Sequence, residues 1–234
     1  MQNEIVLITG ATRGLGLATA EALSAQGYQV IVTGRNSQAL QKLHDRFKKA
    51  GLNITTLVMD VADDKSVQQT KDKVEKEFGK LDCLVNNAGV ILESEFDFKN
   101  IPPAMILDTI NINAIGAIRT MQAFQLLLAK SKNPRIVNVS SGMGALTDMN
   151  SGYTAYRISK AALNVATLQA HFSLHDQYKI RAIAVCPGWV KTDMGGPNAT
   201  RELQEGISGI VWAVNTPASG PSGQFFRDGV EINW

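Results

Sequence analysis

Short, uninterrupted apolar runs alternate along the chain with longer segments in which apolar residues recur at helical spacing. The apolar runs predict buried strands at residues 5–9, 29–33, 54–59, 83–85, 135–140 and 180–185. The segments between them predict helices at about residues 15–26, 37–50, 65–78, 103–130 and 154–177. Apolar strands separated by helices indicate a parallel sheet that is buried on both faces.

This alternation predicts the α/β class, with a doubly wound parallel sheet and helices on both of its faces. No linker or break in composition divides residues 1–234, so we expect one domain. The stretch 192–206 differs, because it contains Gly195-Gly196-Pro197-Asn198 and little apolar periodicity. It follows the carboxyl end of a strand, where such sheets bind ligands, so we predict a lid over a site. A plain surface loop is the alternative.

Composition and charge narrow the possible partners. The net charge is +2 with both signs interspersed, which gives no reason to expect a nucleic-acid or membrane partner. No apolar run approaches membrane-spanning length, and the first residues do not have the composition of a signal peptide. Cys83 and Cys186 lie far apart in apolar stretches, so we interpret both as core residues and expect a reducing, cytoplasmic location.

Two other kinds of catalytic site find little support in the sequence. His171 and His175 lie four residues apart on a predicted helix, but no further ligand accompanies them, so we predict no metal site. A Gly-x-Ser-x-Gly motif, which would indicate a serine hydrolase, does not occur in the chain.

A glycine-rich turn directly follows the first predicted strand and reads Gly10-Ala11-Thr12-Arg13-Gly14-Leu15-Gly16. Glycines at this position let the backbone approach a pyrophosphate, and the helix that follows offers unpaired N–H groups to the phosphates. The turn therefore predicts a dinucleotide site. Tight packing of the strand on the helix is the other interpretation of the same glycines.

The end of the second predicted strand bears on the choice of cofactor. NAD sites usually have an acidic residue there to bind the ribose 2′-hydroxyl, but no acidic residue occurs between Glu21 and Asp45. Arg35 takes that place, and Arg13 lies in the glycine-rich turn. Two guanidinium groups beside one pocket favour a 2′-phosphate, so we predict NADP(H) rather than NAD(H). The alternative for each arginine is a solvated surface charge.

Tyr156 and Lys160 lie four residues apart near the start of a predicted helix and so share one helical face. A free tyrosine has a pKa of about 10 and is a poor acid–base group at neutral pH. A neighbouring ammonium group lowers that pKa, which predicts a proton-transfer pair. An exposed surface pair would have the same spacing.

Further motifs occur in order with these, namely Asn86-Asn87-Ala88-Gly89, Asn113 and Ser140-Ser141-Gly142. Together with the glycine-rich turn and Tyr-x-x-x-Lys, this combination resembles the short-chain dehydrogenase/reductase family in its one-domain, carbonyl-reductase-like branch. The resemblance covers about residues 5–229 and implies a Rossmann-type fold.

The resemblance also implies roles for single residues. Tyr156 is expected to be the general acid in reduction and the base in oxidation, with Lys160 lowering its pKa and holding the nicotinamide ribose. Ser141 is expected to hydrogen-bond the substrate oxygen, rather than Ser140, which should end its strand. Asn113 is expected to anchor a water leading to Lys160, whereas the nearby Asn111 is interpreted as helix-surface polarity.

Cofactor and substrate residues follow from the same motifs. The expected cofactor-binding residues are Gly10, Thr12, Arg13, Gly14, Leu15, Gly16, Arg35, Asp60, Val61, Asn87, Ala88, Gly89, Tyr156, Lys160, Pro187, Gly188, Val190 and Thr192. The expected substrate-binding residues are Ser141, Met143, Leu146, Met149, Trp189 and Met194, with Ile91 and Leu92 close by. The spacing from Ser141 to Tyr156 is slightly longer than is common in the family, which adds residues beside the pocket.

The apolar set predicts a hydrophobic ketone or aldehyde as substrate, reduced reversibly to an alcohol, although several of these residues could simply pack the core. A 3-oxoacyl thioester reductase of fatty-acid synthesis is an alternative within the class. A non-catalytic NADP(H)-binding sensor is an alternative outside it. The resemblance further implies assembly as a homodimer or homotetramer.

Overall fold

A computed structural model describes residues 4–93 and 98–234 of the protein. Within these residues, one sheet of eight strands has the order β3-β2-β1-β4-β5-β6-β7-β8. Neighbours from β3 to β7 are parallel, and β8 is antiparallel to β7. The strands are β1 (Ile5–Ile8), β2 (Gln29–Gly34), β3 (Ile54–Val58), β4 (Cys83–Asn86), β5 (Arg135–Val139), β6 (Arg181–Val185), β7 (Phe225–Arg227) and β8 (Val230–Ile232).

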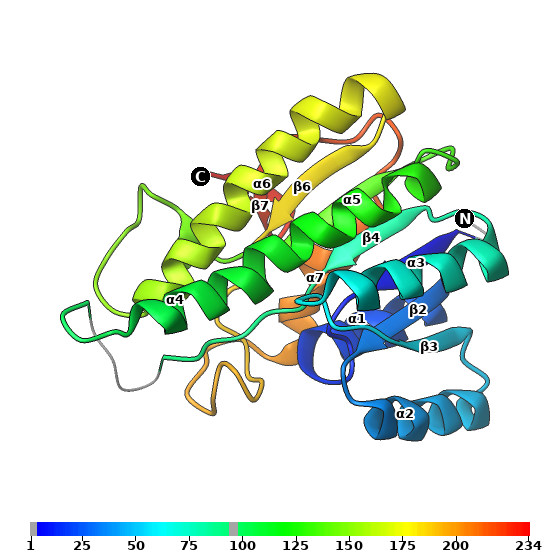
Figure 1. Ribbon diagram of the computed structural model, residues 1–234, viewed down its shortest axis with the longest axis horizontal. Coiled ribbons are helices and arrows are strands. Elements are labelled where there is room, and N and C mark those ends of the chain that lie inside the picture. Colours follow the sequence, from blue (N-terminus) through cyan, green and yellow to red (C-terminus); the bar gives the residue numbers. More distant parts are fainter. Residues whose placement is uncertain (1–3, 94–97) are drawn as a thin grey trace.

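Helices cover both faces of this sheet (Figure 1). They are α1 (Gly14–Ala25), α2 (Ser37–Ala50), α3 (Asp64–Phe78), α4 (Pro103–Ile110), α5 (Gly116–Leu128), α6 (Thr154–Tyr178) and α7 (Leu203–Val214). Successive strand residues point to opposite faces, so the apolar run of β1 serves two cores. Ile8 belongs to the core formed with Phe47 of α2 and Ile210 of α7, whereas Leu7 belongs to the core formed with Phe124 of α5.

The strand order reverses direction at β1. The chain runs outward from β1 to β2 and β3, then returns to place β4 on the other side of β1. The segments that leave β1 and β4 therefore diverge at the carboxyl edge of the sheet, where ligands bind in open α/β folds. Both the glycine-rich turn and Asn87-Ala88-Gly89 leave the sheet at this edge, as the sequence predicts.

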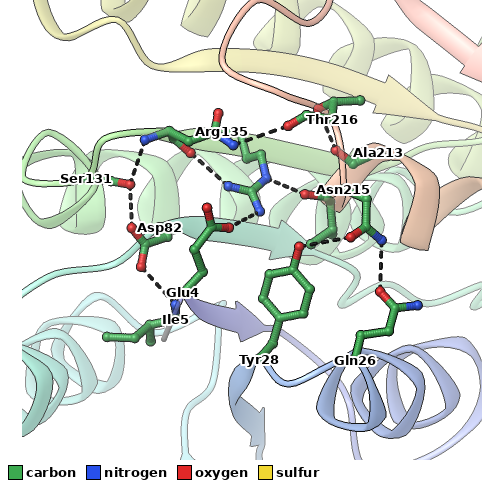
Figure 2. Close-up of polar contacts among 12 residues, drawn as sticks. Glu4, Ile5, Gln26, Tyr28, Asp82, Ser131, Arg135, Ala213, Asn215 and Thr216 are labelled. Atoms are coloured by element: carbon green, nitrogen blue, oxygen red, sulfur yellow. Dashed lines mark hydrogen bonds and ion pairs between the residues drawn. The ribbon is translucent and has the colours of Figure 1, made fainter. Parts of the chain in front are cut away.

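A buried polar network closes the opposite edge of the sheet (Figure 2). The guanidinium of Arg135, which is 2% exposed, pairs with Glu4 at 2.6 Å and donates to the Val214 carbonyl at 2.5 Å. The Tyr28 hydroxyl donates to Asn215 Oδ1 at 2.9 Å. A buried charge needs such partners. These contacts hold the C-terminal end of α7 against the edge of the sheet that lies opposite the cleft.

The fold confirms the predicted class and the six predicted strands, with differences of a residue or two at their ends. The predicted helical region over 103–130 is confirmed as α4 and α5, which are joined without a break by a π-helical turn at Asn111–Ile115 that was not predicted. Helix α7 and strands β7 and β8 were not predicted. Among the described residues, none of the helices combines the length and the apolar character needed to cross a membrane.

Candidate active site

A cleft of about 1250 Å³ opens at the carboxyl edge of the sheet. Its walls come from the glycine-rich turn, the segments after β2, β3, β4 and β5, the start of α6 and residues 186–195. Pockets for single small molecules usually have about 300–1,000 Å³. This cleft therefore has room for a dinucleotide together with a small second ligand.

The glycine-rich turn lies against the segment after β4. Gly10 has a φ of +62°, and a Cβ atom there would lie 2.7 Å from the Ala88 Cα atom. The Asn87 side-chain amide donates to the carbonyls of Thr9 at 2.9 Å and Gly10 at 3.1 Å, which fixes the turn. Gly16 lies outside the cleft lining, and a Cβ atom there would lie 2.5 Å from Asn87 Nδ2. Close approach of two backbone segments is thus the reason for these glycines.

Arg13, Arg35, Asp60 and Val61, which the sequence predicts to bind the cofactor, all line the cleft. The Arg35 side chain is exposed, whereas Arg13 forms an ion pair with Asp193. That pair joins the glycine-rich turn to the segment predicted to be a lid.

Tyr156, Lys160 and Ser141 meet at the inner end of the cleft. Tyr156 and Lys160 are buried, with 8% and 4% of their surfaces exposed. The Lys160 ammonium lies 5.5 Å from the centre of the Tyr156 ring and donates to the Val139 carbonyl at 2.8 Å. Ser141 follows β5 directly and hydrogen-bonds Tyr156. Its neighbour Ser140 is buried and donates to Asn164, which agrees with its predicted structural role.

Burial controls the protonation of this pair. It raises the pKa of Tyr156 to about 12, although the hydrogen bond from Ser141 acts in the opposite direction. Burial also lowers the pKa of Lys160 to about 8. The net direction is therefore opposite to the one predicted from the neighbouring cation, because desolvation of the phenolate outweighs the contributions that lower the pKa of Tyr156. At neutral pH Tyr156 therefore carries its proton.

Asn113 lies in the π-helical turn behind the cleft wall rather than in the lining itself. Its amide oxygen accepts from Val90 N at 2.8 Å, and its amide nitrogen donates to the Val90 carbonyl and to Ser159 Oγ, both at 2.9 Å. The side chain is thus occupied by protein groups. Asn111 accepts from Arg119 at 2.9 Å, which agrees with its interpretation as a structural polar residue.

The predicted substrate residues divide into two groups. Met143, Trp189, Met194, Ile91 and Leu92 line the cleft.

Leu146 and Met149 lie outside the lining, with 72% and 44% of their surfaces exposed. The buried Arg157 binds the loop that contains them, donating to the carbonyls of Gly152 at 2.8 Å and Met143 at 3.3 Å. The cleft lining of this structure therefore includes neither of these two predicted substrate-binding residues.

Polar groups that the sequence reasoning missed also line the cleft. They are Glu93, Asp148, Asn150, Tyr153, Arg157, Cys186, Asp193 and Arg227. Arg157 is part of the Tyr-x-x-x-Lys motif, but no local pattern signals that it binds the preceding loop. His171, considered as a metal ligand, instead bonds Ser222 Oγ at 2.8 Å.

Comparison with known proteins gives consistent results. The carbonyl reductase Sniffer of Drosophila melanogaster is 31% identical and superimposes with a TM-score of 0.89, with both chains fully covered. The NADPH-bound carbonyl reductase from chicken fatty liver is 28% identical, with a TM-score of 0.89, and covers all of this chain and 95% of the other. The 3-oxoacyl-(acyl-carrier-protein) reductase FabG of Pseudomonas aeruginosa is 33% identical over 208 residues, covering 88% of this chain and 79% of that protein.

The family profile described as short chain dehydrogenase matches residues 4–203, which include the glycine-rich turn, Ser141, Tyr156 and Lys160. The matched region covers most of the chain, and the fold and cleft agree with it. The chain therefore belongs to the short-chain dehydrogenase/reductase family of oxidoreductases.

Proposed function

We propose that this protein is an NADP(H)-dependent oxidoreductase that reduces a hydrophobic ketone or aldehyde to an alcohol, reversibly, with Tyr156 as general acid. The observation that carries the proposal is the buried arrangement of Ser141, protonated Tyr156 and Lys160 at the inner end of a dinucleotide-sized cleft. Likeness to two carbonyl reductases, one of them NADPH-bound, supports the same reaction class.

The residues of the cleft fit a nicotinamide dinucleotide. Gly10, Gly14 and Gly89 line the cleft, so that backbone without side chains faces the space where the dinucleotide would lie. The glycine-rich turn and the start of α1 would hold the pyrophosphate. Lys160 would hold the nicotinamide ribose. Val190 and Thr192 would bind the carboxamide of the nicotinamide. Arg35 would bind the 2′-phosphate of NADP(H), because no carboxylate at the end of β2 repels it.

The cofactor supplies the hydride that goes to the carbonyl carbon. As negative charge grows on the carbonyl oxygen, Ser141 and Tyr156 donate hydrogen bonds to it, and the Tyr156 hydroxyl then transfers its proton. The Lys160 cation stabilises the phenolate that remains. General-acid assistance of this kind is typically worth about 10²–10⁴-fold in rate.

The substrate end of the cleft combines apolar and polar walls. Met143, Trp189 and Met194 provide adaptable apolar surface, and Arg227 and Asp148 add charged groups at the same end. We propose a substrate that is largely hydrophobic around its carbonyl group and polar at its periphery.

A 3-oxoacyl thioester is a second candidate substrate, supported by the likeness to FabG. A carrier-protein partner would need free basic side chains at the mouth of the cleft. Lys191 pairs with Glu202, and Arg201 pairs with Asp228, so neither of these two side chains is a free cation. This pairing favours a free carbonyl compound.

We also propose a homodimer or homotetramer. Large apolar side chains are exposed on the neighbouring helices α4, α5 and α6, namely Leu107, Leu126, Val165 and Phe172, at 59% or more of their surfaces. Exposed apolar patches of this kind commonly mark protein interfaces. Cys83 and Cys186 are buried and unpaired, which is compatible with the proposed cytoplasmic location.

The test is consumption of NADPH, and separately of NADH, with a panel of hydrophobic aldehydes and ketones. We expect turnover with NADPH well ahead of NADH, abolished in Tyr156→Phe. Binding of NADPH without turnover of any carbonyl compound would favour a non-catalytic sensor. Failure to bind either cofactor would refute the proposal.

A further inference from the structure

Glu93 lies in the segment after β4, on the wall of the cleft, with only 2% of its surface exposed. Its carboxylate accepts hydrogen bonds from two successive backbone N–H groups at the start of α6, Ala155 N at 2.8 Å and Tyr156 N at 2.6 Å. Glu93 is thus bonded directly to the peptide group of the proposed general acid. No motif of the family resemblance includes it.

The start of α6 needs an acceptor from elsewhere in the chain. The first N–H groups of a helix have no partner within the helix, and a side chain at the residue before it usually binds one of them. Here that residue is Tyr153, which has a φ of +55° and provides no side-chain cap. Glu93, more than sixty positions earlier, supplies the acceptors instead, and its negative charge lies at the favourable end of the helix dipole.

The carbonyl of Tyr156 is also linked, through two side chains, to the segment that follows β4. Ser159 Oγ donates to it at 2.7 Å, and Asn113 donates to Ser159 Oγ at 2.9 Å. Asn113 also bonds both the N–H and the carbonyl of Val90, three residues before Glu93. The contacts close a ring from Val90 through Asn113, Ser159 and Tyr156 to Glu93. Both peptide groups of Tyr156 are therefore tied to the segment that leaves β4.

We propose that Glu93 is a positioning residue that fixes the backbone of Tyr156, and through it the hydroxyl, relative to Ser141 and Lys160. This inference rests on the proposed reductase function. Proton transfer depends steeply on geometry, and a displacement of about 1 Å can cost about 10²-fold in rate. Removal of the cap frees the first turn of α6 while leaving the phosphate-binding turn intact, because the two lie on different segments of the cleft wall.

The experiment compares wild-type protein with Glu93→Ala and Glu93→Gln. We expect Glu93→Ala to lower kcat by about 10- to 100-fold while KM for NADPH changes by less than about two-fold. Glu93→Gln keeps a carbonyl oxygen as acceptor for one of the two N–H groups, so it should recover much of the lost kcat. A merely structural residue would produce neither the split between kcat and KM nor the recovery.

Asp82 provides a matched control. Its carboxylate is also 2% exposed and accepts a backbone hydrogen bond, from Ile5 N at 2.8 Å, but at the opposite edge of the sheet (Figure 2). Asp82→Asn should lower the melting temperature, as Glu93→Ala does, with kcat unchanged for the folded protein.

Amide hydrogen exchange gives a readout that needs no turnover. We expect faster exchange at residues 155 and 156 in Glu93→Ala and wild-type rates there in Asp82→Asn. Unchanged exchange at these amides, or an unchanged kcat in Glu93→Ala beside an active wild type, would overturn the inference. An inactive wild type would instead count against the proposed reaction, so the two failures are distinguishable.

Discussion

We expect the buried charge of Lys160 to lower the free energy of unfolding of the protein. The Lys160 ammonium is buried and, among the residues that the structure describes, donates a hydrogen bond only to the Val139 carbonyl, at 2.8 Å. Burial lowers its pKa from the usual 10.5 to about 8, and at pH 7 that difference corresponds to about 3 kcal/mol of lost stability. Methionine has a similar length and no charge. Lys160→Met leaves the Val139 carbonyl without its partner, which costs about 1 kcal/mol, so we expect a net gain of about 2 kcal/mol.

The gain should depend on pH in a defined direction. The folded protein loses the Lys160 proton at a lower pH than the unfolded chain, so the penalty is complete below about pH 8 and fades towards pH 10.5. About 2 kcal/mol of it should disappear between pH 7 and pH 9.5. Other groups that titrate in this range, such as Cys83 with its pKa of about 11, are present in both proteins and cancel in the comparison.

Thermal and urea unfolding of both proteins without cofactor, at pH 7 and pH 9.5, measure this difference. For a chain of this size, 2 kcal/mol corresponds to about 4–8 °C in melting temperature. The exposed Lys73 on α3 provides the control, since Lys73→Met should leave stability unchanged at both pH values. A Lys160→Met protein less stable than wild type at pH 7, or a difference that does not shrink with rising pH, would refute the reasoning. Whatever its stability, the Lys160→Met protein should have lost its reductase activity.

Three other changes test separate parts of the structure. Arg35→Asp should reduce the preference for NADPH over NADH by about 10- to 100-fold, measured as the ratio of kcat/KM values; an unchanged ratio would exclude Arg35 from the 2′-phosphate site. Gly10→Ala forces a Cβ atom to within 2.7 Å of Ala88 Cα and should cost about 1–3 kcal/mol in urea unfolding and weaken NADPH binding. Gly27→Ala, also at positive φ but with nothing within 4 Å, should retain wild-type binding. Phe172→Glu should lower the mass seen by light scattering, whereas Val230→Glu, equally exposed on β8, should not.

The parts of the fold that could be predicted are those whose local pattern decides the structure. Strands β1, β2, β4, β5 and β6 are short, largely apolar runs whose residues are almost all buried, as expected for parallel strands covered on both faces. The edge strand β3 contains Thr55 and Thr56 and is only partly buried. Helix α7 escaped prediction because Gly206 and Gly209 weaken its helical signal. The structure explains Gly206, where a Cβ atom would lie 2.5 Å from a Val190 methyl group. Strands β7 and β8 have three residues each, too few to show a period.

The candidate site divides in the same way. Tyr156, Lys160, Ser141 and Asn113 stand in ordered motifs, so they could be identified from the sequence. The groups that hold them could not. Glu93 contacts α6 across more than sixty positions, and nothing in the sequence around it indicates a helix cap.

The burial that destabilises the protein also sets the protonation states of Tyr156 and Lys160 that the proposed reduction requires. Before proton transfer the site contains a neutral Tyr156 and a buried Lys160 cation, whose charge faces a ring 5.5 Å away and a single carbonyl. After transfer the phenolate compensates that cation. A buried ion pair is less costly than an isolated buried charge, so the environment that penalises Lys160 alone favours the loss of the Tyr156 proton to the substrate. The interaction grows as the transition state is approached, which is the kind that accelerates a reaction rather than merely strengthening binding. The instability expected from Lys160 and the acidity required of Tyr156 thus have one physical origin, and Lys160→Met should remove both together.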